Sequence, residues 1–328
     1  MSILIAGVGS IGRRHLRNLR HLGVRDLVLL RSGRSTYGDE EVSDLPVETE
    51  VRKALLHHPT AVIVANPTAL HLDIAIPAAD AGCHLLIEKP VSHTLERVSE
   101  LLRIVREKSL KVLVGYQFRF HPALRQIKQW LAAQAIGTVT SVHVHWGEYL
   151  PGWHPGEDYR QGYSARSDLG GGVVLTLSHP FDYLRWLLGE IHAVSAVTRR
   201  LSDLELDVED VAEITLHFAS GMIGTVHLDY VQRPPGHWLQ IRGHGGTIYW
   251  DAANGKASCY RAPDGQWTHY ALPPGFERNT MFLDEMQHFL ACLEGEVAAG
   301  ANLEDGVRAL EIAVAAKRSA SEGRVVEV

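Results

Sequence analysis

The sequence predicts an α/β protein with two domains: a doubly wound parallel sheet first, then an α+β domain whose sheet is mostly antiparallel. Short apolar runs alternate with helical segments as far as residue 115, which is the pattern of βαβ units. A Gly-x-Gly-x-x-Gly segment joins the first strand to the first helix. Farther on, strand candidates follow one another across short turns, as in a β meander.

The composition is that of a soluble globular protein. The chain has 328 residues, 45% of them hydrophobic and 21% charged, and a formal net charge of -6, which fits one large or two ordinary domains. We expect no nucleic-acid partner, because there is no basic excess, and no membrane association, because no apolar run has the length of a span. The N-terminus has no signal-peptide pattern, so we expect a cytoplasmic protein.

Cysteines and histidines give no sign of a metal centre. The three cysteines are scattered, which argues against disulfides and against a zinc site. The 19 histidines are dispersed and show no ligand spacing such as HExxH. We therefore expect no metal.

The glycine-rich segment predicts a dinucleotide site. It follows a strand at Ser2–Ala6 and precedes a helix at Arg13–Leu22. The first glycine allows a tight turn, the second lets the backbone approach a pyrophosphate, and the third lets the helix pack against the strand. The helix N-terminus then offers N–H groups to the anion. The cofactor-binding residues expected here are Gly7, Gly9, Ser10, Ile11 and Gly12; the alternative is a glycine-rich turn without a ligand.

The end of the second strand, Asp26–Leu30, favours NADP. NAD sites usually place an acid about 20 residues beyond the glycines to bind the ribose 2′-hydroxyl. No acid occurs in Leu30–Arg34, whereas Arg31, Ser32 and Arg34 suit a 2′-phosphate. We predict NADP, with NAD as the alternative cofactor.

The strand His84–Ile87 ends in Glu88-Lys89-Pro90, where we place the chemistry. The carboxyl ends of strands in such a sheet face the crevice that binds ligands. Lys89 can there donate a hydrogen bond to, or share a proton with, a substrate hydroxyl; the alternative is a surface lysine. The other elements expected in this domain are a helix at Glu48–His57, a strand at Ala61–Ala65, helices at Ala69–Ala81 and Thr94–Lys108, and a strand at Lys111–Gly115.

The change to antiparallel order predicts a first domain at 1–121 and a second at 122–328. A long aromatic loop, Glu148–Leu169, contains Tyr159, Arg160 and Arg166, which suit a polyhydroxylated or anionic ligand; a packed crossover or an oligomer contact is the alternative. Helices are expected at Ala123–Ala135, after Ser178 as far as Leu188, at Asn279–Leu293 and at Leu303–Glu322. Strands are expected at Thr138–Gly147, His192–Arg200, Val211–Phe218, Met222–Tyr230, Trp238–Arg242, Thr247–Asp251 and Lys256–Arg261.

A series of motifs resembles one enzyme family over most of the chain. The order is Gly7-x-Gly9-x-x-Gly12, Asn66-Pro67-x-x-x-His71, Glu88-Lys89-Pro90, Gly115 to Pro122, Gly170 to Gly172, and Ser178 to Leu184. It is similar to that of the Gfo/Idh/MocA oxidoreductases, the relatives of glucose-fructose oxidoreductase and inositol 2-dehydrogenase. The resemblance implies an N-terminal Rossmann domain and a cis bond before Pro90. It also implies a C-terminal domain with an open, mostly antiparallel sheet, which often forms an oligomer interface, here in a homodimer or homotetramer.

The resemblance also implies an NAD(P)-dependent oxidoreductase that transfers a hydride between nicotinamide and a hydroxyl carbon of a sugar, cyclitol or nucleotide-linked sugar. It makes Lys89 and His179 the catalytic residues, with His179 as the acid/base, since imidazole titrates near neutral pH. Two other functions stay open: a cofactor-retaining enzyme that cleaves glycosides, and a non-catalytic NAD(P)-binding regulator. Further cofactor-binding residues would be Asn66, Pro67, His71, Glu88 and Lys89. The substrate-binding residues would be Lys89, Arg119, Tyr159, Arg160, Arg166, Thr176, His179 and Asp182.

One departure concerns the residues before His179. Family members commonly carry an aspartate three or four residues earlier, where this chain has Leu175 and Thr176. The Thr176 hydroxyl, or Asp182 one helical turn later, can take its place. His237 is a further candidate to reach the site from a strand end.

Overall fold

The computed structural model describes residues 1–33 and 40–328, which form two compact units. The first comprises Met1–Gln117 and Arg278–Val307, and the second comprises Phe118–Glu277 and Arg308–Val328. The division at Gln117 lies close to the boundary expected at residue 121. The segment Arg278–Val307, however, packs with the first unit rather than the second.

The first unit contains the parallel sheet that the sequence predicts. Its strand order is β3-β2-β1-β4-β5-β6, the doubly wound arrangement. Every residue of β1, β2, β4 and β6 is buried, as expected for strands covered by helices on both faces. The strands are β1 (Ile3–Ala6), β2 (Leu27–Leu30), β3 (Val47–Glu48), β4 (Ala61–Val64), β5 (His84–Ile87) and β6 (Val112–Val114).

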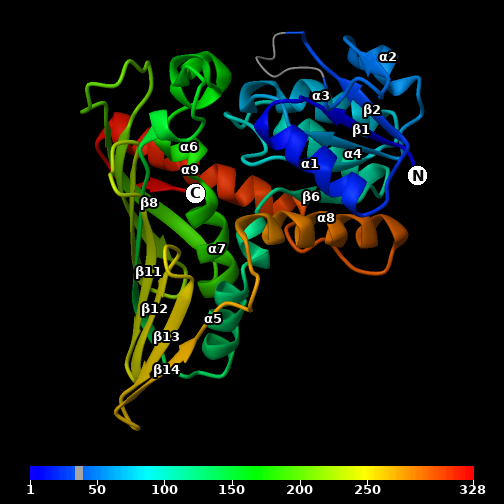
Figure 1. The fold of residues 1–328 in the computed structure, drawn as a ribbon. Coiled ribbons are helices and arrows are strands. Elements are labelled where there is room, and N and C mark those ends of the chain that lie inside the picture. Colours follow the sequence, from blue (N-terminus) through cyan, green and yellow to red (C-terminus); the bar gives the residue numbers. More distant parts are fainter. Residues whose placement is uncertain (34–39) are drawn as a thin grey trace. The chain divides into compact units, whose positions relative to one another are not determined.

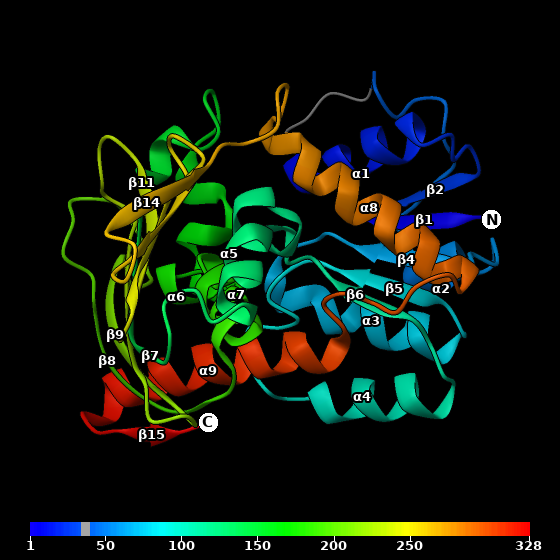
Figure 2. The same cartoon turned by 90° about the horizontal axis from the view of Figure 1, so that it is seen from below.

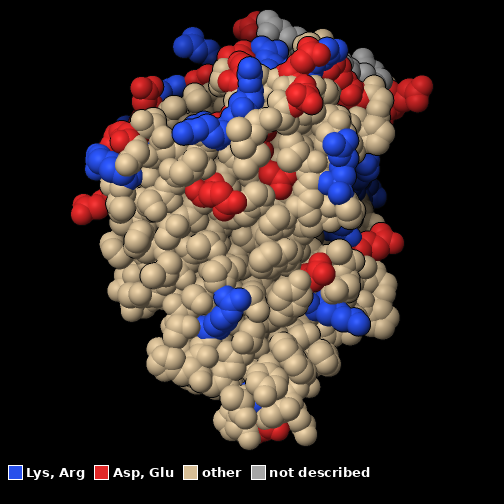
Figure 3. Space-filling model, turned by 90° about the vertical axis from the view of Figure 1, so that its left-hand side faces the viewer, with Lys and Arg blue, Asp and Glu red and all other residues tan. Residues whose placement is uncertain are grey.

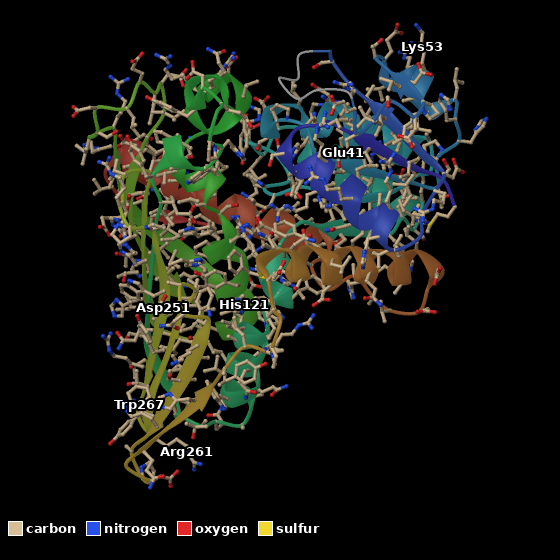
Figure 4. All side chains as sticks on the ribbon, in the orientation of Figure 1. Glu41, Lys53, His121, Asp251, Arg261 and Trp267 are labelled. Carbon is tan, nitrogen blue, oxygen red and sulfur yellow. The ribbon has the colours of Figure 1, made fainter. Side chains whose placement is uncertain are left out.

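Helices cover both faces of this sheet. Helices α1 (Ser10–His21) and α8 (Arg278–Glu294) lie on one face, and α3 (His71–Asp80) and α4 (Val98–Glu107) lie on the other (Figure 2). On α1, the guanidinium of Arg17 binds Glu41 at 2.6 Å (Figure 4). Helix α2 (Val51–Leu55) is shorter than predicted because Val47–Glu48 pairs with β2 as a strand.

The second unit contains a nine-stranded sheet of order β14-β13-β12-β11-β7-β10-β9-β8-β15 (Figure 1). All neighbouring pairs are antiparallel except β7 and β10, which are parallel. The mostly antiparallel sheet is thus confirmed. The strands are β7 (Val139–Gly147), β8 (Ile191–Arg199), β9 (Val211–Phe218), β10 (Ile223–Asp229), β11 (Gly236–Gly243), β12 (Gly246–Asp251), β13 (Lys256–Arg261), β14 (Gln266–Tyr270) and β15 (Val326–Glu327).

The two faces of the nine-stranded sheet differ. Helices α5 (Pro122–Ala132), α6 (Val173–Thr176) and α7 (His179–Leu188) cover one of them (Figure 1). Trp146 of β7 is buried on this inner face. His121, which precedes α5, is also buried, and its ring meets that of Trp250 on β12 edge-on at 5.2 Å (Figure 4). His143 and His145 project from the opposite face of β7 and are partly exposed.

Among the described residues of the second unit, no helix lies against that outer face. The surface on this side shows few charged side chains in its central part (Figure 3).

The last helix, α9 (Leu303–Glu322), begins in the first unit and ends in the second, where the Ser319 hydroxyl accepts a hydrogen bond from Ala196 N–H at 3.0 Å. Among the described residues, no helix combines the length and the apolar character that crossing a bilayer requires.

Candidate active site

The glycine turn lies between the carboxyl ends of β2 and β4, where the strand order reverses. Gly7 has a φ of 94°, and a Cβ on it would collide with the backbone of Ala65 and Asn66. A Cβ on Gly12 would overlap the Gly7 carbonyl, whereas one on Gly9 would meet no atom within 4 Å. The structure therefore gives the outer glycines the packing roles that the motif predicts, and leaves open space at Gly9.

The start of α1 is the end of the motif that we expect to bind an anion. The helix begins at Ser10, which is exposed, and Ile11 is half-buried. The first N–H groups of a helix have no partner within it and attract anions. Cofactor contacts by these two residues remain a prediction, which their exposure permits.

Arg31 and Ser32 follow β2 directly, beside this turn. The last residue of β2, Leu30, accepts a hydrogen bond from Gly7 N–H at 3.0 Å, and Arg31 N–H donates to Glu48 at 2.9 Å. The three described residues after β2, Arg31 to Gly33, include no carboxylate. The third residue expected to bind a 2′-phosphate, Arg34, lies outside the described residues.

His71 connects the turns that follow β4 and β5. Its ring is buried, with Nδ1 2.9 Å from the Pro90 carbonyl and Nε2 2.9 Å from the Asn66 carbonyl. Burial lowers the pKa of His71, although the two carbonyl oxygens favour its protonated form. The Asn66 side-chain amide donates a hydrogen bond to the Leu70 carbonyl at 3.0 Å, which spans the turn that contains Pro67. Together, His71 and Asn66 fix the backbone at this edge of the sheet.

Glu88 is a buried carboxylate next to Lys89 in the turn that follows β5. It is 8% exposed, and it accepts hydrogen bonds from His15 Nε2 at 2.7 Å and from Lys89 N–H at 3.3 Å. Burial alone would raise the pKa of Glu88, but the hydrogen bond from His15 and the positive charges nearby outweigh it and lower the pKa. Glu88 therefore stays ionised and anchors the backbone of Lys89.

Lys89 itself is partly exposed at the carboxyl end of β5. The bond between Lys89 and Pro90 is cis, as the resemblance implies. His15 was not among the residues predicted for the site. Its position on the buried face of α1, with Gly12, Leu16 and Leu19, is the pattern that could have pointed to it.

In the second unit, His179 lies in an aromatic cluster. It is the first residue of α7 and only 3% exposed, and its ring meets Phe118 edge-on at 4.9 Å and Trp146 at 5.6 Å. His237 contacts the same two side chains, stacking on Trp146 at 4.2 Å. His237 Nε2 also lies 3.2 Å from the Tyr183 hydroxyl. Burial lowers the pKa of His237 to about 3, so this ring is neutral at neutral pH.

Arg119 and Asp182 bind each other. The Asp182 carboxylate accepts from Arg119 Nη2 at 2.6 Å and from Arg119 Nε at 3.0 and 3.1 Å, and both side chains are buried. Such two-pronged pairs are strong and directional. The pair ties α7, one turn beyond His179, to the start of the second unit. Substrate binding by Arg119 and Asp182 remains a prediction.

Thr176, at the position of the family's usual aspartate, is also buried. Its side chain interacts with that of Tyr230, whose hydroxyl donates to the Ser164 carbonyl at 3.3 Å. A neutral hydroxyl thus lies where the resemblance leads us to expect a carboxylate, and it lies near the aromatic loop.

The aromatic loop folds into 3₁₀ turns, and its arginines face carboxylates. Arg160 contacts Asp158 at 2.8 Å and Glu205 at 3.2 Å, and Arg166 contacts Asp168 at 2.6 Å. The Tyr159 hydroxyl accepts from Glu205 N–H at 3.1 Å. These side chains are exposed or partly exposed, and their contact with a substrate remains a prediction. The turns are Leu150–Gly152, Tyr159–Gln161, Tyr163–Ala165 and Ser167–Leu169.

The expected site residues thus form two groups. The first unit gathers the glycine turn, Arg31, Ser32, the turn after β4, and Glu88-Lys89-Pro90 along the carboxyl edge of the parallel sheet. The second unit places His179, Thr176 and the Arg119–Asp182 pair around α6 and α7, and adds His237. Within each group, the residues lie on neighbouring elements.

Comparison with known proteins identifies the family. A model described as "Oxidoreductase family, NAD-binding Rossmann fold" matches residues 1–116, and one described as "Oxidoreductase family, C-terminal alpha/beta domain" matches residues 128–328. An uncharacterized oxidoreductase of Synechocystis, sll0816, is 30% identical over 229 residues, which are 65% of this chain and 61% of that protein. The match therefore spans less than two thirds of that relative's length.

Two further similarities extend over the whole chain. Myo-inositol 2-dehydrogenase of Thermotoga maritima is 26% identical over 345 residues, covering 100% of this chain and 98% of that protein. The structure of levoglucosan dehydrogenase in complex with NADH and levoglucosan has the same fold, with a TM-score of 0.88 at 21% identity and coverage of 100% and 99%. With both halves matched by its models, this chain belongs to the Gfo/Idh/MocA family of oxidoreductases.

Proposed function

We propose that the protein is an NAD(P)-dependent dehydrogenase that acts on a hydroxyl carbon of a sugar, cyclitol or nucleotide-linked sugar. The observation that carries this proposal is the position of Lys89. It extends from a turn anchored by the buried Glu88–His15 pair, on the same sheet edge as the glycine turn that we expect to bind a dinucleotide. The names of the relatives, dehydrogenases of myo-inositol and levoglucosan, support this substrate class.

In this reaction the nicotinamide, when bound, supplies the hydride chemistry. The Lys89 ammonium donates a hydrogen bond to the substrate oxygen as negative charge develops there. Glu88 holds the backbone from which Lys89 extends. His179 takes the hydroxyl proton during oxidation and returns it during reduction. Phe118 and Trp146 pack against its ring and limit its rotation.

The preferred cofactor in this proposal is NADP, with NAD as the alternative. Support comes from the absence of a carboxylate in Arg31–Gly33 and from the guanidinium of Arg31. NADH occupies the structure of levoglucosan dehydrogenase, which has the same fold. The preference therefore depends on the residues of this chain and needs a direct comparison of the two cofactors.

We also propose that the chain forms a homodimer or homotetramer through the outer face of the nine-stranded sheet. Its few charges and its lack of a covering helix in the second unit support this arrangement (Figure 3). Light scattering on the purified protein measures the oligomer directly.

The test of the function is a substrate panel. Sugars, cyclitols and nucleotide-sugars are offered with NAD and with NADP, and the absorbance of the reduced nicotinamide is followed. We expect turnover with at least one polyol. A protein that binds the cofactor but oxidises or reduces nothing in the panel would instead fit the non-catalytic regulator. Glycoside cleavage with a tightly retained cofactor and no net redox change would fit the cofactor-retaining enzyme.

A further inference from the structure

Three side chains converge at one end of the outer sheet face in the second unit. His145 of β7 and His227 of β10 are direct partners in the pairing of these strands, and their rings stack at 4.6 Å. Asp229, the last residue of β10, places Oδ2 3.0 Å from His227 Nε2. One nitrogen or oxygen atom from each of His145, His227 and Asp229 lies within 4.8 Å of the others. Small side-chain movements would therefore bring the three atoms to the spacing of ligands around one metal ion.

The carboxylate of Asp229 is held in place. Its Oδ1 accepts two backbone hydrogen bonds, from Val231 N–H at 2.8 Å and Gln232 N–H at 2.7 Å. These bonds fix the side chain with Oδ2 directed toward His227. Only 4% of Asp229 is exposed, so the carboxylate is not simply part of a solvated surface.

His227 is oriented by a second carboxylate. Glu213, its direct partner on β9, places Oε1 2.6 Å from His227 Nδ1. A carboxylate on one ring nitrogen orients the imidazole and leaves the other nitrogen to bind a metal, as in many metal sites.

Gly147 leaves room for a fourth donor. A Cβ on Gly147 would collide with Asp229 Oδ2 and with the amide oxygen of Gln232. The same amide oxygen is hydrogen-bonded to His145 Nε2. The lack of a side chain at Gly147 therefore lets two oxygen atoms approach the two imidazoles.

We propose that His145, His227 and Asp229 bind a divalent transition-metal ion, with zinc as the representative ion and the Gln232 amide oxygen able to complete the shell. Two imidazoles and a carboxylate suit zinc, nickel or cobalt. Ligand atoms around tetrahedral zinc lie about 3.3 Å apart, given Zn–N and Zn–O distances of roughly 2.0–2.2 Å. The His227–Asp229 pair already meets this separation, and rotation of the His145 side chain would supply the rest.

This site is separate from the proposed active site. Successive residues of a strand point to opposite faces, so His145 lies on the other face of β7 from Trp146, the neighbour of His179. The sequence predicts no metal site because the three ligands do not form a linear motif. Strand pairing brings them together, and the proposal does not depend on the enzymatic function.

The test uses the untagged full-length protein after chelator treatment. Zinc is titrated by calorimetry, and cobalt is titrated in parallel to read the ligand field from its visible absorption. We expect one zinc per chain. His145→Ala and His227→Ala should each weaken binding by more than about tenfold, and Glu213→Gln by about 10- to 100-fold. His217→Ala is the matched control, since His217 is on the same face, on β9, outside the cluster, and should leave the affinity unchanged.

Two results would overturn the proposal. One is the lack of stoichiometric zinc binding by the wild-type chain, which would leave the cluster as a hydrogen-bonded network. The other is zinc binding that His145→Ala, His227→Ala and Glu213→Gln all leave unchanged. Glu213 is exposed, so its substitution keeps the test valid even if a histidine variant fails to fold.

Discussion

His15 Nε2 lies 2.7 Å from the Glu88 carboxylate, and both side chains are buried within the first unit. This contact joins the helix that follows the glycine turn to the strand end that carries Lys89. It thereby couples the two halves of the proposed cofactor and catalytic edge. Because the pKa of Glu88 is lowered, folding should be favoured above the pKa of an unfolded glutamate, about 4.3, and this stabilisation should be lost as pH falls through the lower folded pKa.

We predict that His15→Ala destabilises the first unit by about 3–5 kcal/mol, because it leaves a buried carboxylate without its partner. The double variant His15→Ala/Glu88→Gln should be less destabilised than His15→Ala. Urea denaturation followed by far-UV circular dichroism gives the free energies, and hydrogen exchange of β1 and β5 peptides localises the effect. Equal losses in the single and double variants would show that His15 contributes through packing alone.

The Arg119–Asp182 pair leads to a second prediction. Asp182→Ala should destabilise the second unit by about 3–5 kcal/mol, since it strands a buried guanidinium. All seven tryptophans lie between Trp130 and Trp267, so tryptophan fluorescence reports this unit. The double variant Arg119→Met/Asp182→Leu should recover much of the loss. If Asp182→Asn kept full stability but lost kcat/KM, substrate binding would be the main role of Asp182.

The buried His237 makes the second unit sensitive to acid. Its folded pKa of about 3 lies below the unfolded value of about 6.5, so the unfolded chain binds a proton that the folded chain does not. Stability should therefore fall by about 1.4 kcal/mol per pH unit as pH drops below about 6.5, until it levels off near the folded pKa. His121, with a folded pKa of about 4, adds a similar slope over a narrower range.

Denaturation of wild type and His237→Gln, monitored by tryptophan fluorescence between about pH 7 and pH 5, tests this prediction. On acidification, the free energy of unfolding of the variant should fall less steeply than that of wild type, by about 1.4 kcal/mol per pH unit, which is the contribution of one histidine. If the free energies of unfolding of the two proteins changed in parallel with pH, folding would not lower the pKa of His237.

Arg31 tests the cofactor assignment. Arg31→Ala should lower kcat/KM with NADP by about 10- to 100-fold, the value of a hydrogen bond to a charged group, and change kcat/KM with NAD by less than about twofold. Arg25→Ala is the matched control, because Arg25 is exposed just before β2, at its opposite end. A uniform loss with both cofactors, or no loss with either, would argue against 2′-phosphate recognition by Arg31.

Local patterns predicted most of the fold. The glycine turn, the parallel order and most strands were readable because apolar periodicity and turn residues report on them directly. Strand β14 was missed because nearly all its residues are exposed and show no alternation. β15 was missed because it has only two residues. The position of α8 in the first unit was also not predictable, since a helical pattern does not reveal which domain the helix packs against.

The site was predicted less completely. The cis bond before Pro90 was expected from the family resemblance, and the packing roles of Gly7 and Gly12 were expected from the fixed spacing of the glycine motif. The hydrogen-bond partners of His15, His237, Asp182 and His227 could not be predicted. Each partner is distant in the sequence, and tertiary packing or strand pairing brings it into contact. A sequence pattern identifies a residue type that can do chemistry, whereas the structure shows what already occupies its hydrogen bonds.

The central claim is that Lys89 acts on the substrate rather than on the fold or the cofactor. The most direct test compares Lys89→Ala with wild type for NAD(P) affinity by fluorescence titration and for turnover of the substrate found in the panel. Lys111→Ala, an exposed lysine at the amino end of β6, is the control. We predict near-normal cofactor affinity and a fall in kcat of about 10²- to 10⁴-fold for Lys89→Ala alone. Turnover within about twofold of wild type would contradict the account.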